Sequence, residues 1–224
     1  MRGLGGWGYQ VPRFVKWFLR DVFWRINPSE KVIYLTFDDG PIPEVTPKVL
    51  DILDEFGVKA TFFCVGDNVR KHPEFYKEVI KRGHAVGNHT FNHIKGFDYS
   101  VDEYVENVKK ASEYIQSPLF RPPHGQITPK KIKRLRADYQ IIMWDIITYD
   151  YDKTFSPEKM MRIVRRKSRN GSIVVFHDSI KAEKNVLETL PKALKFWKEE
   201  GYEIKKMIWD CGFGKFEDQI SHTD

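Results

Sequence analysis

From Lys31 onward, short runs of β-branched and aromatic residues alternate with segments whose apolar residues recur at helical spacing. The pattern predicts seven strands, in the runs KVIYLTF, KATFFCVG, HAVGN, LFRP, YQIIMWD, SIVVFHD and YEIKKMI. It predicts six helices between them, at residues 45–56, 67–82, 100–116, 128–137, 156–169 and 183–200. Capping side chains before a proline predict three helix starts, at Thr46-Pro47, Thr128-Pro129 and Ser156-Pro157. Glycines predict three helix ends, at Gly57, Gly83 and Gly201.

Strands that alternate with helices imply a parallel α/β sheet with right-handed crossovers. A nearly closed barrel and an open doubly wound sheet both fit this order. The polar runs TFDDGP, NHTFNH, RPPHG, WDIITYD and FHD follow the ends of five strands. A barrel brings all its strand ends to one mouth, whereas an open sheet gathers its site at one switch point. We therefore expect an incomplete (β/α) barrel.

The sequence predicts one domain over residues 30–210, with an N-terminal helical extension over 1–29 and a polar tail over 211–224. Residues 11–26, VPRFVKWFLRDVFWRI, predict a basic, aromatic-rich helix that can contact a membrane surface. The alternative, which we favour, is that its apolar side chains cover one end of the core; these are Phe14, Trp17, Phe18 and Val22. Charges interrupt this stretch, so it does not resemble a signal peptide. We expect a location in the cytoplasm or at the inner membrane face.

Composition adds bounds on the core and on partners. The 224 residues are 41% hydrophobic, enough for one sizeable core, and the net charge of +6 suits an anionic partner without selecting one. Basic residues cluster in KKIKRLR at 130–136 and RIVRRKSR at 162–169, where interspersed apolar residues predict solvated faces of amphipathic helices. We expect no nucleic-acid partner. Cys64 and Cys211 lie far apart and predict no disulfide framework.

Asp38 and Asp39 stand together at a strand end, before Gly40-Pro41. Neighbouring residues on a strand point to opposite faces, so both carboxylates reach one cavity only if the strand ends there. A plain turn is the alternative reading of Asp-Gly-Pro. His89 and His93, four residues apart, become a candidate metal site when combined with a strand-end carboxylate, because two histidines and one carboxylate are a known zinc set. The second aspartate is then free to act as a base.

Other polar residues follow further strands. Arg121 precedes two prolines and can hold a carboxylate at the same mouth, and His177 ends a strongly apolar strand. Asp150 can hydrogen-bond such a histidine and fix its tautomer. Asp145 and Asp178 are weaker candidates, either as helix caps or as ligands for other groups at the rim.

TFDDGP, HTFNH, FRPPHG, WDIITYDY and IVVFHDS, in this order, resemble the five successive motifs of the polysaccharide deacetylases, carbohydrate esterase family 4. The resemblance runs from about Lys31 to Met207 and implies a distorted seven-stranded (β/α) barrel. It implies that Asp38 is the catalytic base and that Asp39, His89 and His93 bind one divalent metal ion, zinc, with cobalt or nickel as alternatives. The resemblance also implies that Arg121 orients Asp38, that His177 is the general acid and that Asp150 supports His177. The backbone N–H of His124 would donate to the oxyanion.

Two departures from the family pattern stand out. His124 occupies a position where the family usually has tyrosine, and the fourth motif has Ile147 and Tyr151 in place of an aspartate and a tryptophan. The implied activity is metal-dependent removal of N-acetyl groups from a polymer that contains N-acetylglucosamine, of peptidoglycan or chitooligosaccharide type, or from its precursor. The alternatives are an esterase that removes O-acetyl groups and a non-catalytic glycan-binding protein.

Overall fold

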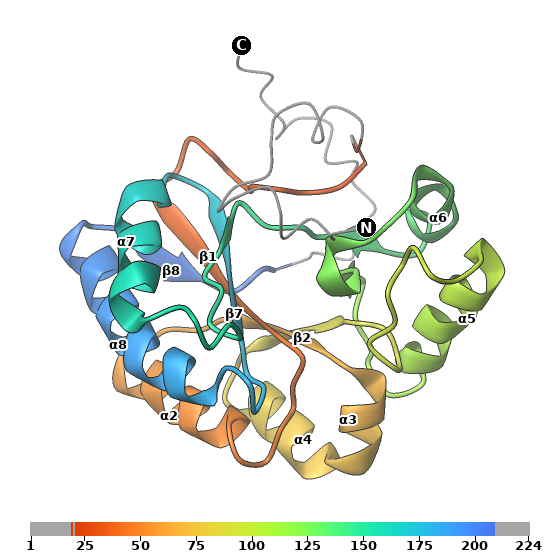
Figure 1. Ribbon diagram of the computed structural model, residues 1–224, viewed down its shortest axis with the longest axis horizontal. Helices are drawn as coiled ribbons and strands as arrows, with labels where there is room; N and C mark the ends of the chain where they lie inside the picture. Colours follow the sequence, from red (N-terminus) through yellow and green to blue (C-terminus); the bar gives the residue numbers. More distant parts are fainter. Residues whose placement is uncertain (1–18, 20, 209–224) are drawn as a thin grey trace.

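Strand β1 (Val32–Asp38) lies in the middle of the sheet in the computed structural model, which describes residue 19 and residues 21–208 (Figure 1). Within the described residues the sheet has eight strands. Their spatial order is β5 (Gln140–Ile141), β4 (Leu119–Phe120), β3 (Ala85–Asn88), β2 (Thr61–Cys64), β1, β7 (Ser172–His177) and β6 (Ile146–Ile147), and β8 (Glu203–Lys205) pairs with the first half of β1. All these pairings are parallel. The curled parallel sheet confirms the predicted incomplete barrel.

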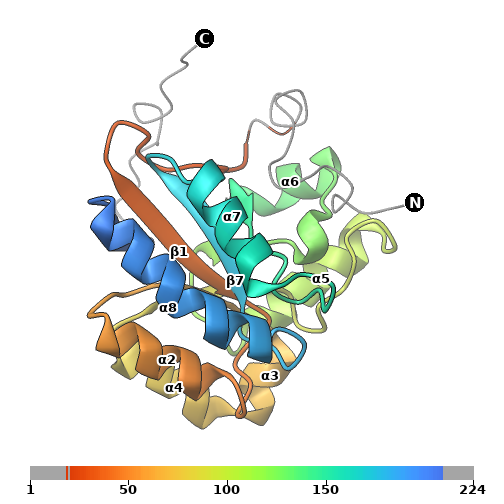
Figure 2. The same cartoon turned by 60° about the vertical axis from the view of Figure 1, so that its left-hand side comes forward.

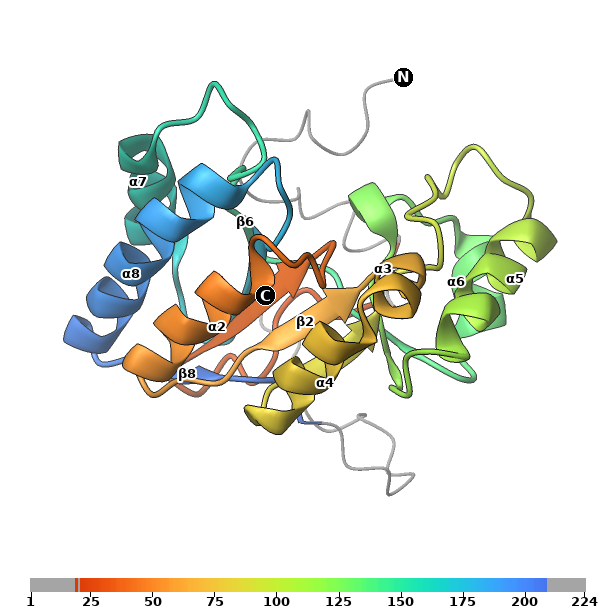
Figure 3. The ribbon, with the colours of Figure 1, turned by 90° about the horizontal axis from the view of Figure 1, so that it is seen from below.

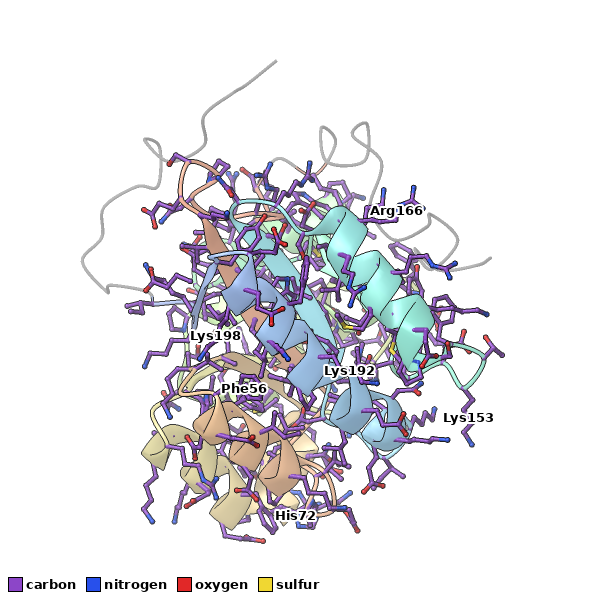
Figure 4. All side chains as sticks on the ribbon, turned by 90° about the vertical axis from the view of Figure 1, so that its left-hand side faces the viewer. Phe56, His72, Lys153, Arg166, Lys192 and Lys198 are labelled. Atoms are coloured by element: carbon purple, nitrogen blue, oxygen red, sulfur yellow. The ribbon has the colours of Figure 1, made fainter. Side chains whose placement is uncertain are left out.

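Helices surround the outside of the sheet (Figures 1 and 3). They are α2 (Thr46–Glu55), α3 (Gly66–Lys71), α4 (Pro73–Lys81), α5 (Val101–Ser112), α6 (Pro129–Leu135), α7 (Pro157–Lys167) and α8 (Glu183–Glu199), with a 3₁₀ turn, η2, at Pro123–Gly125. Figure 2 shows α7 and α8 side by side over β1 and β7. On the same face, Lys198 of α8 donates to the carbonyl of Phe56, which follows α2 (Figure 4). No helix in the described part of the chain combines the length and the hydrophobicity needed to cross a bilayer.

The alternation of β1 separates two hydrophobic clusters. Ile33, Leu35 and Phe37 belong to a cluster shared with α2, α7 and α8. Val32 and Tyr34 belong to a second cluster, shared with β4, α5 and α6. Because successive strand residues point to opposite faces, Thr36 and Asp38 continue the face of Val32 and Tyr34. The last inward position of β1 is therefore a carboxylate.

Two predicted elements are each divided in the structure. The run YQIIMWD was predicted as one strand, but only Gln140 and Ile141 form β5, and the chain then crosses to the other end of the sheet as β6. The helix predicted over 67–82 is broken into α3 and α4 at His72, whose φ of −132° is not helical. Pro73 explains that break, since a proline disfavours the helical conformation of the residue before it.

The described part of the N-terminal extension is not a helix. Residues 21–29 form turns and isolated bridges, so the helix predicted over 11–26 is wrong at its C-terminal end, while residues 11–18 and 20 lie outside the described residues. Phe23 exchanges backbone hydrogen bonds with Ile141 and Met143 beside β5, and Ile26 N donates to Gly171 O just before β7. The segment thus pairs backbone groups on both sides of the barrel's gap, which a helix would leave unpaired. Val22 is buried, as we expected, whereas Phe14, Trp17 and Phe18 lie among the residues that the structure does not describe.

Most predicted helix boundaries are confirmed. Thr128 and Ser156 accept hydrogen bonds from backbone N–H groups in the first turns of α6 and α7. Gly57, Gly83 and Gly201 all have positive φ just after a helix. Asp145, in contrast, neither caps a helix nor reaches the rim, because its buried carboxylate accepts hydrogen bonds from Arg169 and Ser172 near the start of β7.

Thr46 was predicted as a cap, but it is the first residue of α2 and holds the turn that follows β1. Its Oγ1 accepts from Ile42 N at 2.8 Å and donates to Oδ2 of Asp178 at 2.6 Å. Oδ1 of Asp178 accepts from Gly40 N at 3.0 Å, and Asp178 is buried. A Cβ on Gly40 would lie 2.0 Å from the Asp178 carboxylate. Glycine is therefore required at position 40 by the close approach of a second buried carboxylate.

We predict that Gly40→Ala destabilises the fold by about 1–3 kcal/mol, because the added methyl group must displace Asp178 or the turn. Urea unfolding measures this change. Gly57→Ala is the matched control: its φ is +62°, but no atom lies within 4 Å of the new Cβ, so only backbone strain of about 1 kcal/mol is expected. Equal losses of stability in the two variants would contradict the steric explanation.

Candidate active site

The end of the β1–β7 ladder brings two predicted catalytic residues together. Asp38 and His177 are the last register partners of these two parallel strands. The Asp38 carboxylate is almost completely buried, and the His177 side chain is 12% exposed. The two side chains therefore stand at the mouth formed by the carboxyl ends of the strands.

Arg121 leaves β4 and extends its guanidinium through the interior of the barrel. Nη1 donates to Oδ1 of Asp38 at 2.6 Å and to Oγ1 of Thr36 at 2.8 Å. Nη2 donates to Met143 O at 3.0 Å, and the group lies 4.1 Å from the ring centroid of Phe63. Arg121 is fully buried, so these partners replace the water that its charge would otherwise bind. The contact holds the Asp38 carboxylate in one orientation.

Asp39, His89 and His93 form the predicted triad of candidate metal ligands. One donor atom from each lies within 4.8 Å of the others. Nε2 of His93 is 3.1 Å from Oδ1 of Asp39, and Nε2 of His89 is 3.8 Å from the same oxygen. Nδ1 of His89 lies 2.8 Å from Arg121 O, an acceptor that requires the proton on Nδ1 and leaves Nε2 with its lone pair. The donor set and this tautomer both fit a divalent metal ion with further positions open.

Charge and burial act differently on two members of the triad. Burial by itself raises the pKa of Asp39, but the hydrogen bond with His93 and the nearby histidine charges outweigh it and hold that pKa below its usual range. Burial lowers the pKa of His89 to about 4. The triad therefore offers a carboxylate and a neutral imidazole near neutral pH, which are the forms that bind metals.

His177 is held by Asp150 on its other side. Nδ1 lies 2.7 Å from Oδ1 of Asp150, and the backbone N–H of His177 donates to Oδ2 at the same distance. Burial lowers the pKa of His177, but the charge and hydrogen bond of Asp150, together with Asp39 and Asp38, outweigh burial and raise it to about 9. The ring of Tyr151 packs edge-on against His177, with the centroids 4.9 Å apart. Tyr151 thus supports the imidazole in the position where the family pattern has a tryptophan.

His124 lies in the turn η2, on the His93 side of the mouth. Its ring is exposed and makes an edge contact with His93 at a centroid distance of 4.7 Å. Its φ is +58°, and no hydrogen-bond acceptor for its backbone N–H is found among the described residues. A free N–H at this rim can donate to an oxyanion.

Backbone strain is concentrated around this mouth. Six residues other than glycine have positive φ in the described chain, and five of them belong to the rim: Asp39, Thr90, His93, His124 and Tyr149. Such conformations cost about 1–3 kcal/mol each and persist only where the surroundings hold them. The strain is an additional sign of a functional site.

Sequence reasoning overlooked two groups that hold the site, Asn68 and Thr36, and ranked a third, Asp178, only as a weaker candidate. Asn68 donates to Asp39 O at 2.8 Å, Thr36 shares Nη1 of Arg121, and Asp178 fixes the turn after Asp39. Burial raises the pKa of Asp178 to about 8, although hydrogen bonds from Thr46 and Gly40 partly offset it. Of these three, only Asp178 carried a sequence signal, because it follows His177 directly at a strand end.

The site thus combines a triad of metal-ligand type, a carboxylate held by arginine and an imidazole held by a second carboxylate. Together these groups can bind a metal ion, remove a proton on one side and donate a proton on the other. That combination suits hydrolysis of an acyl group.

Known proteins share this arrangement of the chain. The family model for polysaccharide deacetylases matches residues 25–141. A peptidoglycan-N-acetylglucosamine deacetylase of Bacillus cereus is 36% identical over 191 residues, which cover 82% of this chain and 89% of that protein. The crystal structure of the Bc1960 peptidoglycan N-acetylglucosamine deacetylase superposes with a TM-score of 0.82 at 29% identity, covering 88% of this chain and 95% of that one.

A third similarity shows that the fold also occurs without activity. A Bacillus anthracis protein described as a family 4 carbohydrate esterase pseudoenzyme superposes with a TM-score of 0.74 at 28% identity, over 83% of this chain and 66% of that one. Function must therefore be argued from the residues of the site. The matched family model and the 36% identical relative establish that this chain belongs to the polysaccharide deacetylase family.

Proposed function

We propose that the protein removes N-acetyl groups from N-acetylglucosamine residues of a polysaccharide of peptidoglycan or chitooligosaccharide type, or of its precursor. The observation that carries the proposal is the pairing of Asp38 with His177 across the β1–β7 ladder, beside the triad of Asp39, His89 and His93. A base and an acid are thus held on neighbouring strands at one candidate metal site.

The family is metal-dependent, and Asp39, His89 and His93 are the residues that would hold the ion. A bound divalent cation would polarise the acetyl carbonyl and make water more acidic. We propose zinc as the native metal, with cobalt or nickel as alternatives, because two imidazoles and a carboxylate are a common zinc set.

Asp38 takes a proton from the attacking water. Arg121 engages Oδ1 of Asp38, so Oδ2 is the oxygen that accepts the proton. The buried guanidinium prevents the carboxylate from rotating away. The backbone N–H of His124 stabilises the negative charge that develops on the carbonyl oxygen.

His177 donates the second proton. Asp150 occupies Nδ1 of His177, so Nε2 faces the substrate and carries the proton to the departing nitrogen. An amine leaves poorly unless it is protonated, whereas an alcohol leaves more readily. The raised pKa of His177 therefore suits an N-acetyl substrate better than an O-acetyl ester.

The presence of both a held base and a held acid distinguishes the proposed enzyme from a non-catalytic glycan-binding protein. Asp38 and His177 each have a buried partner, Arg121 and Asp150, and buried charges of this kind are costly unless they serve a purpose. A binding protein would need neither the base nor the acid.

We expect the purified protein to release acetate from N-acetylated chitooligosaccharides or peptidoglycan, measured by an enzyme-coupled acetate assay. A chelator should abolish release, and added zinc should restore it, because the ligand triad requires a metal to act. O-acetylated xylan serves as the competing substrate. Acetate release that persists after complete metal removal, or that occurs only from O-acetyl groups, would contradict the proposal.

Asp38→Asn should reduce kcat about 100- to 10,000-fold while zinc affinity, measured by calorimetry, changes little. Asp39→Asn is the matched comparison, since it alters the adjacent carboxylate and should weaken zinc binding itself. Full activity in Asp38→Asn would contradict its role as the base. Loss of zinc from Asp38→Asn but not from Asp39→Asn would show that the roles of the two aspartates are reversed.

The pH dependence of kcat tests the His177–Asp150 pair. The acid must be protonated, so the rate should fall as pH rises through the pKa of His177. Asp150→Asn removes the charge that raises this pKa and should move the basic limb about 1–3 pH units lower. Asp152→Asn, which alters a nearby carboxylate that accepts hydrogen bonds from Thr154, should leave the limb in place. If the basic limb is unchanged in Asp150→Asn, that limb reports the titration of a group other than His177.

A further inference from the structure

The two basic clusters of the sequence differ in how far their charges are paired in the structure. In the first, at 130–136, Lys131 is buried and its Nζ donates to the carbonyls of Gly96 and Tyr99. Arg134 pairs with Asp102, and Arg136 pairs with Asp21. This cluster was predicted to be a solvated helix face, which is wrong for Lys131. Most of its charges therefore have hydrogen-bond or ion-pair partners within the fold.

In the second cluster, at 162–169, Arg169 pairs with Asp145, but the cations that precede it on α7 have no acidic partner among the described residues. Helix α7 buries its apolar side toward the sheet, through Met160, Met161, Ile163 and Val164. Its other side, together with one lysine of α8, carries cations that form no ion pair with a carboxylate of the described residues. We call these the α7 cation stripe; it consists of Lys159, Arg162, Arg165, Arg166, Lys167 and Lys192.

Two hollows lie along this stripe. The larger, of about 430 Å³, is lined by Arg162, Arg165 and Arg166 of α7 and by Lys192 of α8. The smaller, of about 220 Å³, is lined by Lys159, Arg162, Arg166 and Lys167. Arg162 and Arg166 therefore form the ridge between the two hollows. Figure 4 shows Arg166 on α7 and Lys192 on the adjacent helix α8, on the same face of the molecule.

The charge of these hollows is unusual for the chain. Among the described residues, their walls contain six cations and a single acid, Glu158, while the whole chain has a net charge of only +6. Like charges three and four residues apart, as in Arg162, Arg165 and Arg166, repel one another on a helix. A bound anion would remove that repulsion, whereas folding alone gains nothing from it.

We propose that the α7 cation stripe binds a linear polyanion whose repeating charge is a phosphodiester, a polyol phosphate polymer. Three of the six cations are arginines, whose planar guanidinium groups match the oxygens of a phosphate in pairs. The eleven residues of α7 extend over about 16 Å, so the stripe offers contacts to several successive phosphates rather than to one ion.

Other polyanionic partners fit less well. A bilayer surface would gain charge contacts alone from the stripe, because Met161 and Ile163 in the hollows are buried and cannot insert. The large exposed apolar side chains of the described chain, Ile80, Phe97, Tyr99, Ile180 and Ile208, all lie outside the stripe. No aromatic side chain is among the described residues that line either hollow. The half-buried rings of Phe155 and Phe196 are overlain by Lys159 and Arg165, so single-stranded nucleic acid would find little surface on which to stack its bases.

The stripe also has a defined position relative to the active site. Helix α7 follows the loop of Asp150 and Tyr151 and runs antiparallel to the strands, so it begins at the rim and descends the flank beside β6 and β7. A polymer bound along it would be held next to the His177 side of the mouth. The proposal is independent of the deacetylation reaction.

The test is binding of a fluorescently labelled, synthetic poly(glycerol phosphate) oligomer to the full chain, followed by anisotropy over a series of salt concentrations. We expect saturable binding at physiological salt that weakens with increasing salt. The triple variant Arg162→Ser, Arg166→Ser, Lys192→Ser should lower affinity at least about 10-fold. It should also reduce the slope of log affinity against log salt by about 2, since each lost phosphate contact removes about 0.7.

The matched control is Lys130→Ser, Arg134→Ser, Arg136→Ser, which removes the same charge from α6 and its C-terminal end. Its affinity should stay within about twofold of the unaltered protein, and thermal unfolding should show both variants folded. Equal losses in the two variants would reduce the effect to net charge and overturn the proposal. Absence of binding at physiological salt would overturn it, as would equal or tighter binding to an RNA oligomer or to phosphatidylglycerol vesicles.

Discussion

The buried contact between Arg121 and Asp38 is the constraint on which the rest of the site depends. A guanidinium without access to water must be fully paired, and breaking such a pair by removing one partner typically costs about 3–5 kcal/mol. Here the partners come from β1 and from the chain after β5, while Arg121 itself follows β4. The ion pair therefore ties the middle of the sheet to one of its ends, and the barrel must curl for these groups to meet.

The same residue connects the base with the candidate metal site. The carbonyl of Arg121 faces Nδ1 of His89, while its side chain holds Asp38. A shift of Arg121 would alter the base and a candidate metal ligand together. Across the mouth, Asp150 gives His177 comparable support from both the ring and the backbone. Each reactive group is thus held by a partner that does not itself face the substrate, which is how precise sites resist thermal motion.

The costs of this arrangement lie at the rim. Asp39 and His93 have left-handed backbones, and Asp178 is a carboxylate buried beside the turn of Gly40. The extensive packing of β1 between two hydrophobic clusters can offset these costs, because each cluster buries large side chains completely. The rigid part of the molecule stabilises the strained part, where the chemistry takes place.

Prediction from the sequence succeeded where a local pattern was strong and failed where distant partners decided. Short β-branched and aromatic runs predicted β1, β2 and β7, and the capping residues of α6 and α7 act as expected. The prediction of YQIIMWD as one strand failed because periodicity does not show which neighbour a strand will pair with. Thr46 failed as a cap because its Oγ1 accepts from Ile42 N rather than from a backbone N–H of α2, while its hydroxyl donates to Asp178, 132 residues away.

The sequence by itself determined the order of strands and helices, the motifs at the strand ends and hence the set of candidate residues. Those features depend on neighbours along the chain. Only the tertiary structure decided that Asp38 is register partner to His177 and that Asp178 requires Gly40. It also decided that Arg134 and Arg136 find acidic partners, while the cations of α7 find none among the described residues. Such facts depend on how the sheet curls and which helix faces meet, and these follow from the packing of the whole chain rather than from any local stretch.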